Sequence, residues 1–214
     1  YAGEPPTNIP DGLWCYRIDR KRVILGGALS DGGNLYAFLK KQLRLPTDAE
    51  DQMRARGAAA HGLTVLPYFF GERSTGYRED AQGAILGLTA SNDGVDILQA
   101  AMESVAFRFA EIHDRLGRLA NIREIVASGG ALRDSSVWPQ IIADVLGRDL
   151  SVSNARESSL RGAVLLALES LGKIEPIDSF STPAASTLAF HPECHQAYTA
   201  ARKLHREFDK TISK

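Results

Sequence analysis

The chain has 214 residues, with 25 Lys and Arg against 26 Asp and Glu and a formal charge of -1. This balance argues against nucleic acid or an anionic membrane as the main partner, and no apolar run is long enough to cross a bilayer. Two cysteines without a CxxC motif exclude a disulfide framework and indicate reduced thiols in a cytoplasmic protein. An apolar fraction of 44% over this length suffices for one large domain or two small ones.

Short apolar runs alternate with helical patterns along the chain. The predicted strands cover 13–18, 22–25, 63–66, 84–88, 125–127 and 150–152. The predicted helices comprise a stretch that carries Leu35, Leu39 and Leu43, then 47–60, a long helix that ends at Gly117, and 136–146, 158–171 and 192–211. The length and continuous apolar stripe of the long helix predict a core helix. One face is also apolar in 136–146, with Val137, Ile141 and Val145, and in 158–171, with Leu160, Val164, Leu168 and Leu171. The first two strands predict a hairpin, and 173–190 is expected to be an irregular connection. The alternation predicts an α/β fold with right-handed βαβ units on a partly parallel sheet.

Two helix starts carry recognisable capping signals. Thr47 and Glu50 have the spacing of a capping box. Ser91 or Asn92 is expected to cap the long helix, because two aspartates then fall in its first turn, where the helix dipole favours acids.

The most informative turn lies in the stretch 124–146. An apolar run breaks at the Ser-Gly-Gly-Ala turn of 128–131, and a helical pattern resumes at Ser136. Two glycines without Cβ let another molecule lie against the backbone, and ligands of open α/β sheets collect at the carboxyl ends of strands. We expect this turn to receive the adenine end of a nucleotide. A turn kept only for strand-to-helix geometry is the open alternative.

Residues 67–82 form a long loop with aromatic side chains and charges of both signs. Long loops in compact domains often carry function. The alternative, given equal weight, is a solvated excursion whose Phe69 and Phe70 tuck into the core.

Other chemical motifs are weak in this sequence. His191, Cys194 and His195 stand at metal-ligand spacing, but they lack a fourth partner nearby and Pro192 marks an ordinary helix start, so no metal site is expected. The GxSxG, GxxxxGK[ST] and GxGxxG patterns do not occur, which argues against a serine hydrolase, a P-loop kinase and a Rossmann dehydrogenase.

Several segments together resemble one family. Residues 83–103, GAILGLTASNDGVDILQAAME, resemble the signature of the FGGY carbohydrate kinases. The matching residues are Gly83, Ile85, Gly87, Leu88, Asp96, Ile97, Ala100, Ala101, Met102 and Glu103. The loop PYFFGERSTGYREDAQG is similar to the PxxxGER loop of the gluconokinase and xylulokinase branch. SGGALRDSSVWPQIIADVLGRDL and ESSLRGAVLLAL resemble the turn and the helix that follow, so that the resemblance runs from about Gly26 to Leu171.

The resemblance implies a ribonuclease-H-like domain of the actin-like ATPase superfamily, with a mixed sheet flanked by helices and its first strand missing. It implies that 1–214 is the C-terminal, ATP-holding domain of a kinase, and that the N-terminal domain, which binds the sugar and supplies the catalytic Asp, is absent from this chain. The start at Tyr1 without Met also suggests a fragment. ATP and Mg²⁺ are the implied cofactors, and a sugar, polyol or sugar acid is the implied substrate.

The resemblance also assigns candidate site residues by position. Gly130 and Asp134 match family residues that contact adenosine, and Gly129 and Ala131 flank them. Asp134 departs from the commoner Asn or Ser. Gly33 matches a glycine near the nucleotide phosphates, while the Gly32-Gly33 pair at the helix start could admit a ligand or only allow tight packing.

The catalytic base is not expected among the carboxylates of this chain. Glu72, Asp80 and Glu103 are expected to be solvated or hydrogen-bonded structural groups. Arg73 could steer a phosphate or a sugar, or it could form a salt bridge to Glu72 or Asp80.

Two functions of different class fit these observations. The first is ATP-dependent phosphorylation of a sugar, polyol or sugar acid, with this chain as the ATP-binding half, inactive alone. The alternative is a non-catalytic actin-like module that senses a nucleotide or a sugar. Trp14, Tyr16, Phe69 and Phe70 fit either the core or the contact surface of a homodimer, so the sequence leaves the oligomeric state open.

Overall fold

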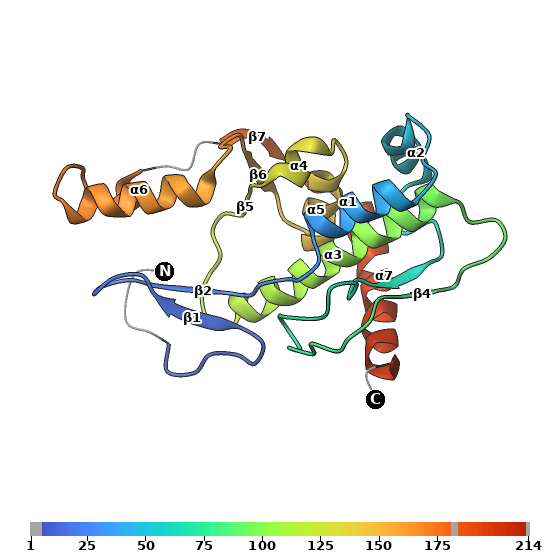
Figure 1. Ribbon diagram of the computed structural model, residues 1–214, viewed down its shortest axis with the longest axis horizontal. Helices are drawn as coiled ribbons and strands as arrows, with labels where there is room; N and C mark the ends of the chain where they lie inside the picture. Colours follow the sequence, from blue (N-terminus) through green and yellow to red (C-terminus); the bar gives the residue numbers. More distant parts are fainter. Residues whose placement is uncertain (1–5, 181–183, 213–214) are drawn as a thin grey trace.

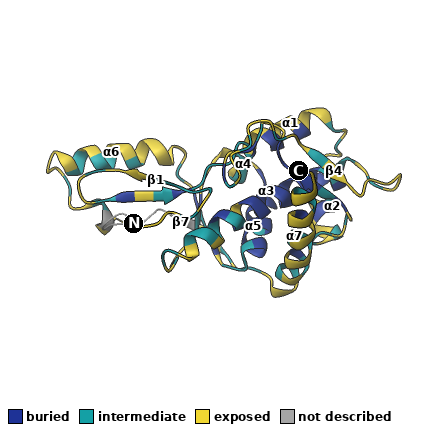
Figure 2. Ribbon diagram, turned by 90° about the horizontal axis from the view of Figure 1, so that it is seen from below, coloured by how far each residue is buried: buried dark blue, intermediate teal, exposed yellow. Residues whose placement is uncertain are grey.

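The computed structural model describes residues 6–180 and 184–212, and the helix α3 (Gly94–Gly117) runs through its centre (Figure 1). Most of its side chains are buried, as the dark blue ribbon of Figure 2 shows. Val95, Met102 and Val105 are each 1% exposed. The length and the apolar stripe of this segment predicted a core helix, and the burial of its side chains confirms that prediction.

The start of α3 is fixed by the residues around its N-terminus. Asp93 is the N-cap, and its carboxylate accepts the backbone N–H groups of Val95 at 2.9 Å and Asp96 at 3.0 Å. The Asp96 carboxylate in turn accepts the Asp93 N–H at 3.0 Å. This capping box satisfies donors that a helix start leaves free. The predicted cap at Ser91 or Asn92 is therefore wrong by one or two residues, because the carboxylate that follows them takes the capping role.

In the described residues, seven strands form three small sheets. They are β1 (Trp14–Arg17), β2 (Val23–Gly26), β3 (Thr64–Leu66), β4 (Ala84–Leu86), β5 (Val126–Ala127), β6 (Leu150–Ser153) and β7 (Ala184–Leu188). The strands β1 and β2 form the predicted antiparallel hairpin, and β3 and β4 also pair antiparallel. The third sheet is mixed, because β6 pairs parallel with β5 and antiparallel with β7.

The predicted fold class is confirmed, and the predicted parallel pairing of the strands is only partly correct. The mixed sheet confirms an α/β fold, but within the described residues the only parallel pair is β5 with β6. The irregular connection predicted for 173–190 is wrong, because it contains β7 and a short 3-10 turn at Ile177–Ser179. A strand of small and polar residues gives little local signal, and β7 forms through pairing with β6.

In the described part of the chain, four helices pack around α3. They are α1 (Gly33–Gln42), α2 (Ala49–Arg56), α5 (Trp138–Leu146) and α7 (Pro192–Ile212). The apolar face predicted for 136–146, the segment of α5, is buried, with Val137, Ile141 and Val145 at 4–7% exposure. The Trp138 indole N–H donates to the Met102 carbonyl of α3 at 3.0 Å and so fixes α5 against the central helix.

The predicted capping box of the second helix is wrong. Among the described residues no side chain caps α2, whose N-cap is Asp48, and the helix ends at Arg56 rather than near 60. The Glu50 carboxylate instead accepts the Ser136 N–H at 2.8 Å and the Tyr36 hydroxyl at 3.1 Å. It therefore ties α2 to its neighbours and is not available to its own helix start.

The helix α6 (Ser158–Ser170) lies apart from this core, beside the β1–β2 hairpin, in both views (Figures 1 and 2). None of its described residues is buried, and Leu160 and Leu171 of its predicted apolar face are 62% and 70% exposed. An ion pair of 2.7 Å between Arg22 and Glu169 joins the hairpin to this helix. Across 6–180 and 184–212, no helix combines the length and the apolar character that crossing a bilayer requires.

The loop 67–82 is anchored by buried side chains other than its two phenylalanines. Phe69 and Phe70 are 36% and 54% exposed and pack against Phe38, so the prediction that they tuck into the core is wrong. The buried side chains of the loop include Tyr68 and Glu72, each at 4% exposure, and Ser74 at 1%.

Candidate functional site

The glycine turn after β5 requires glycine at one position. Gly129 has φ +130° and ψ 156°, a conformation that side-chain-bearing residues rarely adopt. It is the N-cap of a short helix, α4 (Gly130–Asp134), so the predicted turn of 128–131 continues into one helical turn. Gly129 and Gly130 are exposed, and a Cβ at Gly129 would meet no atom within 4 Å. The backbone of this turn is therefore open to another molecule.

The first turn of α1 lies against α4. A Cβ at Gly33 would stand 3.0 Å from the Ala131 Cβ, so glycine permits this close approach. The Asn34 side chain holds the preceding loop, accepting the Gly32 N–H at 2.8 Å and donating to the Ser30 carbonyl at 2.9 Å. No side chain caps α1 among the described residues, and no acid lies in its first turn. Its N-terminal N–H groups therefore keep their capacity for an anion.

The structure brings the predicted site residues into one corner. Gly33 comes from α1, while Gly129, Gly130 and Ala131 come from the β5–α4 turn, and Asp134 lies four residues after Gly130 on the same face of α4. Asp134 is exposed.

The sequence did not point to two charged groups beside this corner. The Arg133 guanidinium donates to the carbonyls of Ala155 at 3.3 Å and Arg156 at 3.5 Å, across from α4. Asp31, just before α1, is 4% exposed and accepts the Phe70 N–H at 3.4 Å, which joins the long loop to the start of α1. Burial raises the pKa of Asp31 to about 6. The Ser-Asp-Gly-Gly run of 30–33 was the available signal.

The carboxylates of the PxxxGER loop and the signature have structural roles. Glu72 pairs with the guanidinium groups of Arg78 and Arg108 and accepts the Gly76 N–H at 3.1 Å. This arrangement fits the prediction of a structural carboxylate, and Arg73 is exposed beside it. Buried charges of this kind are retained when they are paired and hydrogen-bonded.

Glu103 is 1% exposed on α3. It accepts the Ala59 N–H at 3.2 Å and the Tyr198 hydroxyl at 3.1 Å, and it contacts His61 Nε2 at 2.9 Å. It is therefore a second structural carboxylate. Asp80 is exposed, as a solvated group would be.

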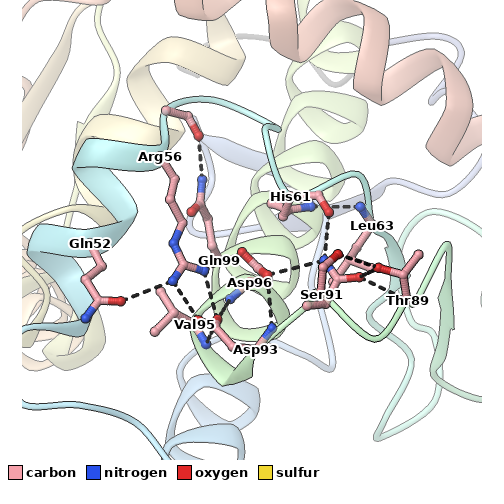
Figure 3. Close-up of polar contacts among 12 residues, drawn as sticks. Gln52, Arg56, His61, Leu63, Thr89, Ser91, Asp93, Val95, Asp96 and Gln99 are labelled. Atoms are coloured by element: carbon pink, nitrogen blue, oxygen red, sulfur yellow. Dashed lines mark hydrogen bonds and ion pairs between the residues drawn. The ribbon is translucent and has the colours of Figure 1, made fainter.

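The signature residues from Thr89 to Gln99 build the start of α3 and the turn before it (Figure 3). Arg56 at the end of α2 pairs with Asp93 at 2.7 Å and also with Asp96, and Gln52 accepts from the same guanidinium at 3.1 Å. The Gln99 amide donates to the Gly57 carbonyl at 2.8 Å. The signature thus orients α3 against α2, away from the glycine corner.

The sequence and the fold of this chain match a known protein family. The model of the C-terminal domain of the FGGY family of carbohydrate kinases matches residues 6–171. The chain therefore belongs to the FGGY family of carbohydrate kinases, whose members share the actin-like ATPase fold.

The curated relatives of this chain include a gluconokinase and a glycerol kinase. The chain is 29% identical over 205 residues to gluconokinase of Bacillus subtilis, covering 88% of this chain and 40% of that protein. It is 27% identical over 194 residues to glycerol kinase of Pseudomonas syringae pv. syringae, covering 89% of this chain and 38% of that protein. The chain thus spans about 40% of the length of the curated relatives it matches.

Solved structures of the family share this arrangement. Gluconate kinase from Lactobacillus acidophilus superposes with a TM-score of 0.86 at 23% identity, over 99% of this chain and 44% of that one. Plasmodium falciparum glycerol kinase with ADP superposes with a TM-score of 0.70 at 22% identity, over 89% of this chain and 39% of that one. At these identities the likeness establishes the fold.

Proposed function

We propose that this chain is the ATP-binding half of a kinase that phosphorylates a hydroxyl of a sugar, polyol or sugar acid. One observation carries the proposal: Gly33 and the Gly129–Ala131 turn, distant in sequence, meet at one exposed corner. The uncapped start of α1 suits the phosphates, because a helix N-terminus presents free N–H groups and a positive dipole end. The exposed glycine backbone suits the flat face of adenine.

The proposal assigns the remaining chemistry to groups outside this chain. Mg²⁺ would be held mainly by ATP phosphates and water, as this ion prefers, since no acid lies in the first turn of α1. The catalytic carboxylate and the sugar site would come from an N-terminal domain, in agreement with the longer relatives. Phosphoryl transfer needs positioning and charge stabilisation at a cleft between two such domains. The isolated chain is accordingly expected to be inactive.

The direct test is ADP release by the full-length protein that contains this chain. Gluconate and xylulose are the first substrates to try, because gluconokinase and xylulose kinase are among the similar proteins. Five- and six-carbon polyols, sugars and sugar acids complete the panel. Release of ADP with one of them supports the kinase. Nucleotide binding without ADP release on the whole panel would contradict it and favour the sensing module.

The site itself is tested with one variant and a matched control. Gly130→Leu places a side chain over the proposed adenine position, where the nearest atom to a Cβ is an Arg133 nitrogen at 3.9 Å. Gly117→Leu adds the same bulk at the end of α3, where a Cβ meets nothing within 4 Å. We expect Gly130→Leu to weaken ATP binding at least tenfold with unchanged sugar affinity. Equal ATP affinity in both variants would remove the turn from the site.

A further inference from the structure

A side-chain cluster away from the glycine corner brings together three ligand types of transition metals. Asp144 lies in the last turn of α5, His191 lies just before α7, and Cys194 lies in the first turn of α7. One oxygen, one nitrogen and one sulfur of these side chains all lie within 4.8 Å of one another. In the sequence, His191, Cys194 and His195 stood at ligand spacing without a further partner, and the structure adds Asp144 from a helix far away in the chain.

The Asp144 carboxylate is oriented by hydrogen bonds. Its Oδ1 accepts the His191 backbone N–H at 2.7 Å and the Gln140 amide at 2.9 Å. Its Oδ2 lies 3.3 Å from His191 Nδ1. Hydrogen bonds that fix a carboxylate in this way are typical of the outer shell of metal sites.

The spacing of these atoms fits a tetrahedral ion. Oxygen and nitrogen ligands bound to Zn²⁺ at tetrahedral angles lie about 3.3 Å apart, given bonds of roughly 2.0–2.1 Å. The observed separation of Asp144 Oδ2 and His191 Nδ1 is 3.3 Å. The Cys194 sulfur lies within 4.8 Å of both atoms and offers a third ligand.

His195 is not part of this cluster, although the sequence placed it beside the other two. Its Nδ1 contacts the Asp144 backbone carbonyl at 2.8 Å, and its ring packs over Gly147. The fourth side of the cluster opens on a cavity of about 400 Å³, lined by Met53, Gln99 and Tyr198 among others. A water molecule or a small ligand has room there to fill a fourth position.

We propose that Asp144, His191 and Cys194 form a site for a divalent transition metal ion, Zn²⁺ being the best match. A thiolate, an imidazole and a single carboxylate suit Zn²⁺ or Co²⁺, whereas Mg²⁺ requires octahedral oxygen ligands. The site is separate from the proposed nucleotide corner and does not depend on the kinase activity. The sequence analysis expected no metal site in this chain. The proposed site differs from that expectation because Asp144, which is distant in sequence, supplies the ligand that His191 and Cys194 lacked.

The experiment is a Co²⁺ titration of the reduced, metal-free full-length protein without nucleotide. We expect a thiolate-to-cobalt absorption band in the near ultraviolet, saturating at one ion per chain and displaced by Zn²⁺. Cys194→Ser should abolish this band, and Cys15→Ser, at the other cysteine of this chain, should leave it unchanged. A parent protein without the band, or a Cys194→Ser variant that keeps it, would overturn the proposal.

Two further variants separate metal binding from folding. His191 is exposed, so His191→Ala should keep the melting temperature of the metal-free protein while weakening Zn²⁺ binding at least tenfold. Gln140→Ala removes one hydrogen bond to the carboxylate and should weaken Zn²⁺ by about 10–100-fold. Zn²⁺ affinity equal to that of the parent in both variants would show that the three side chains only cap α7.

Discussion

The stability of this chain should depend on pH through one buried histidine. His205 on α7 is 2% exposed, with its ring 5.6 Å from that of Phe107. Burial, assisted by the charge of Arg108, lowers the pKa of His205 from its ordinary 6.5 to about 4. Between these values the unfolded chain binds more protons than the folded one. The contribution of neutral His205 to the free energy of unfolding is therefore complete above about pH 6.5, and it is lost as the pH falls toward 4.

The size of the loss follows from the shift in pKa. At about 1.4 kcal/mol per pKa unit, the full window corresponds to about 3 kcal/mol. At pH 5, His205 alone should make the protein about 2 kcal/mol less stable than at pH 7.5. This is a large fraction of the stability of an ordinary domain.

Asp31 opposes this effect. Burial raises its pKa from 3.8 to about 6, so the folded state binds more protons than the unfolded one between these values. Its contribution therefore increases as the pH falls from about 6 to 4, by about 1 kcal/mol at pH 5. The two groups partly cancel in the parent protein, and only variants separate them.

Urea unfolding at about pH 7.5 and pH 5 measures both contributions. We expect His205→Gln to lose about 2 kcal/mol less on acidification than the parent, and Asp31→Asn to lose about 1 kcal/mol more. Both substitutions are nearly isosteric and remove the titration. A His205→Gln variant with the same change in unfolding free energy as the parent would refute the reasoning.

Three further predictions concern single contacts. Glu72→Gln should cost about 3–5 kcal/mol in urea unfolding, because it leaves two guanidinium groups without their buried partner, whereas exposed Glu79→Gln should be nearly neutral; equal effects would contradict this. Asp93→Ala should cost about 1–2 kcal/mol through loss of the α3 cap, and Ser91→Ala should change little; the reverse order would restore the sequence-based cap. Gly129→Ala should cost about 1–3 kcal/mol from its positive φ, and an unchanged melting temperature would argue against that strain.

The periodic segments of the sequence were sufficient for the framework. The apolar stripe of α3 and the buried face of α5 follow from side-chain spacing at 3.6 residues per turn, which is a local property. The β1–β2 hairpin follows from two apolar runs around a polar turn. The FGGY motifs identified the family, and the family match over 6–171 confirms it.

Local sequence patterns did not predict the contacts between distant segments. Glu50 stands at position N3 of the predicted capping box, but its carboxylate accepts the Ser136 N–H instead. The stripe of α6 predicts burial, yet Leu160 remains exposed because the helix lies beside the hairpin, away from the core. A helical pattern says which face is apolar and does not say what covers it.

The sequence by itself determined the fold class, the family and the glycine positions of the candidate nucleotide corner. Only the tertiary structure decided that Gly33 lies against Ala131, that Asp31 is buried beside them, and that Asp144 joins His191 across two helices. The physical reason is that spacing fixes neighbours within about one turn of a helix, whereas the approach of two helices depends on how all their side chains pack together.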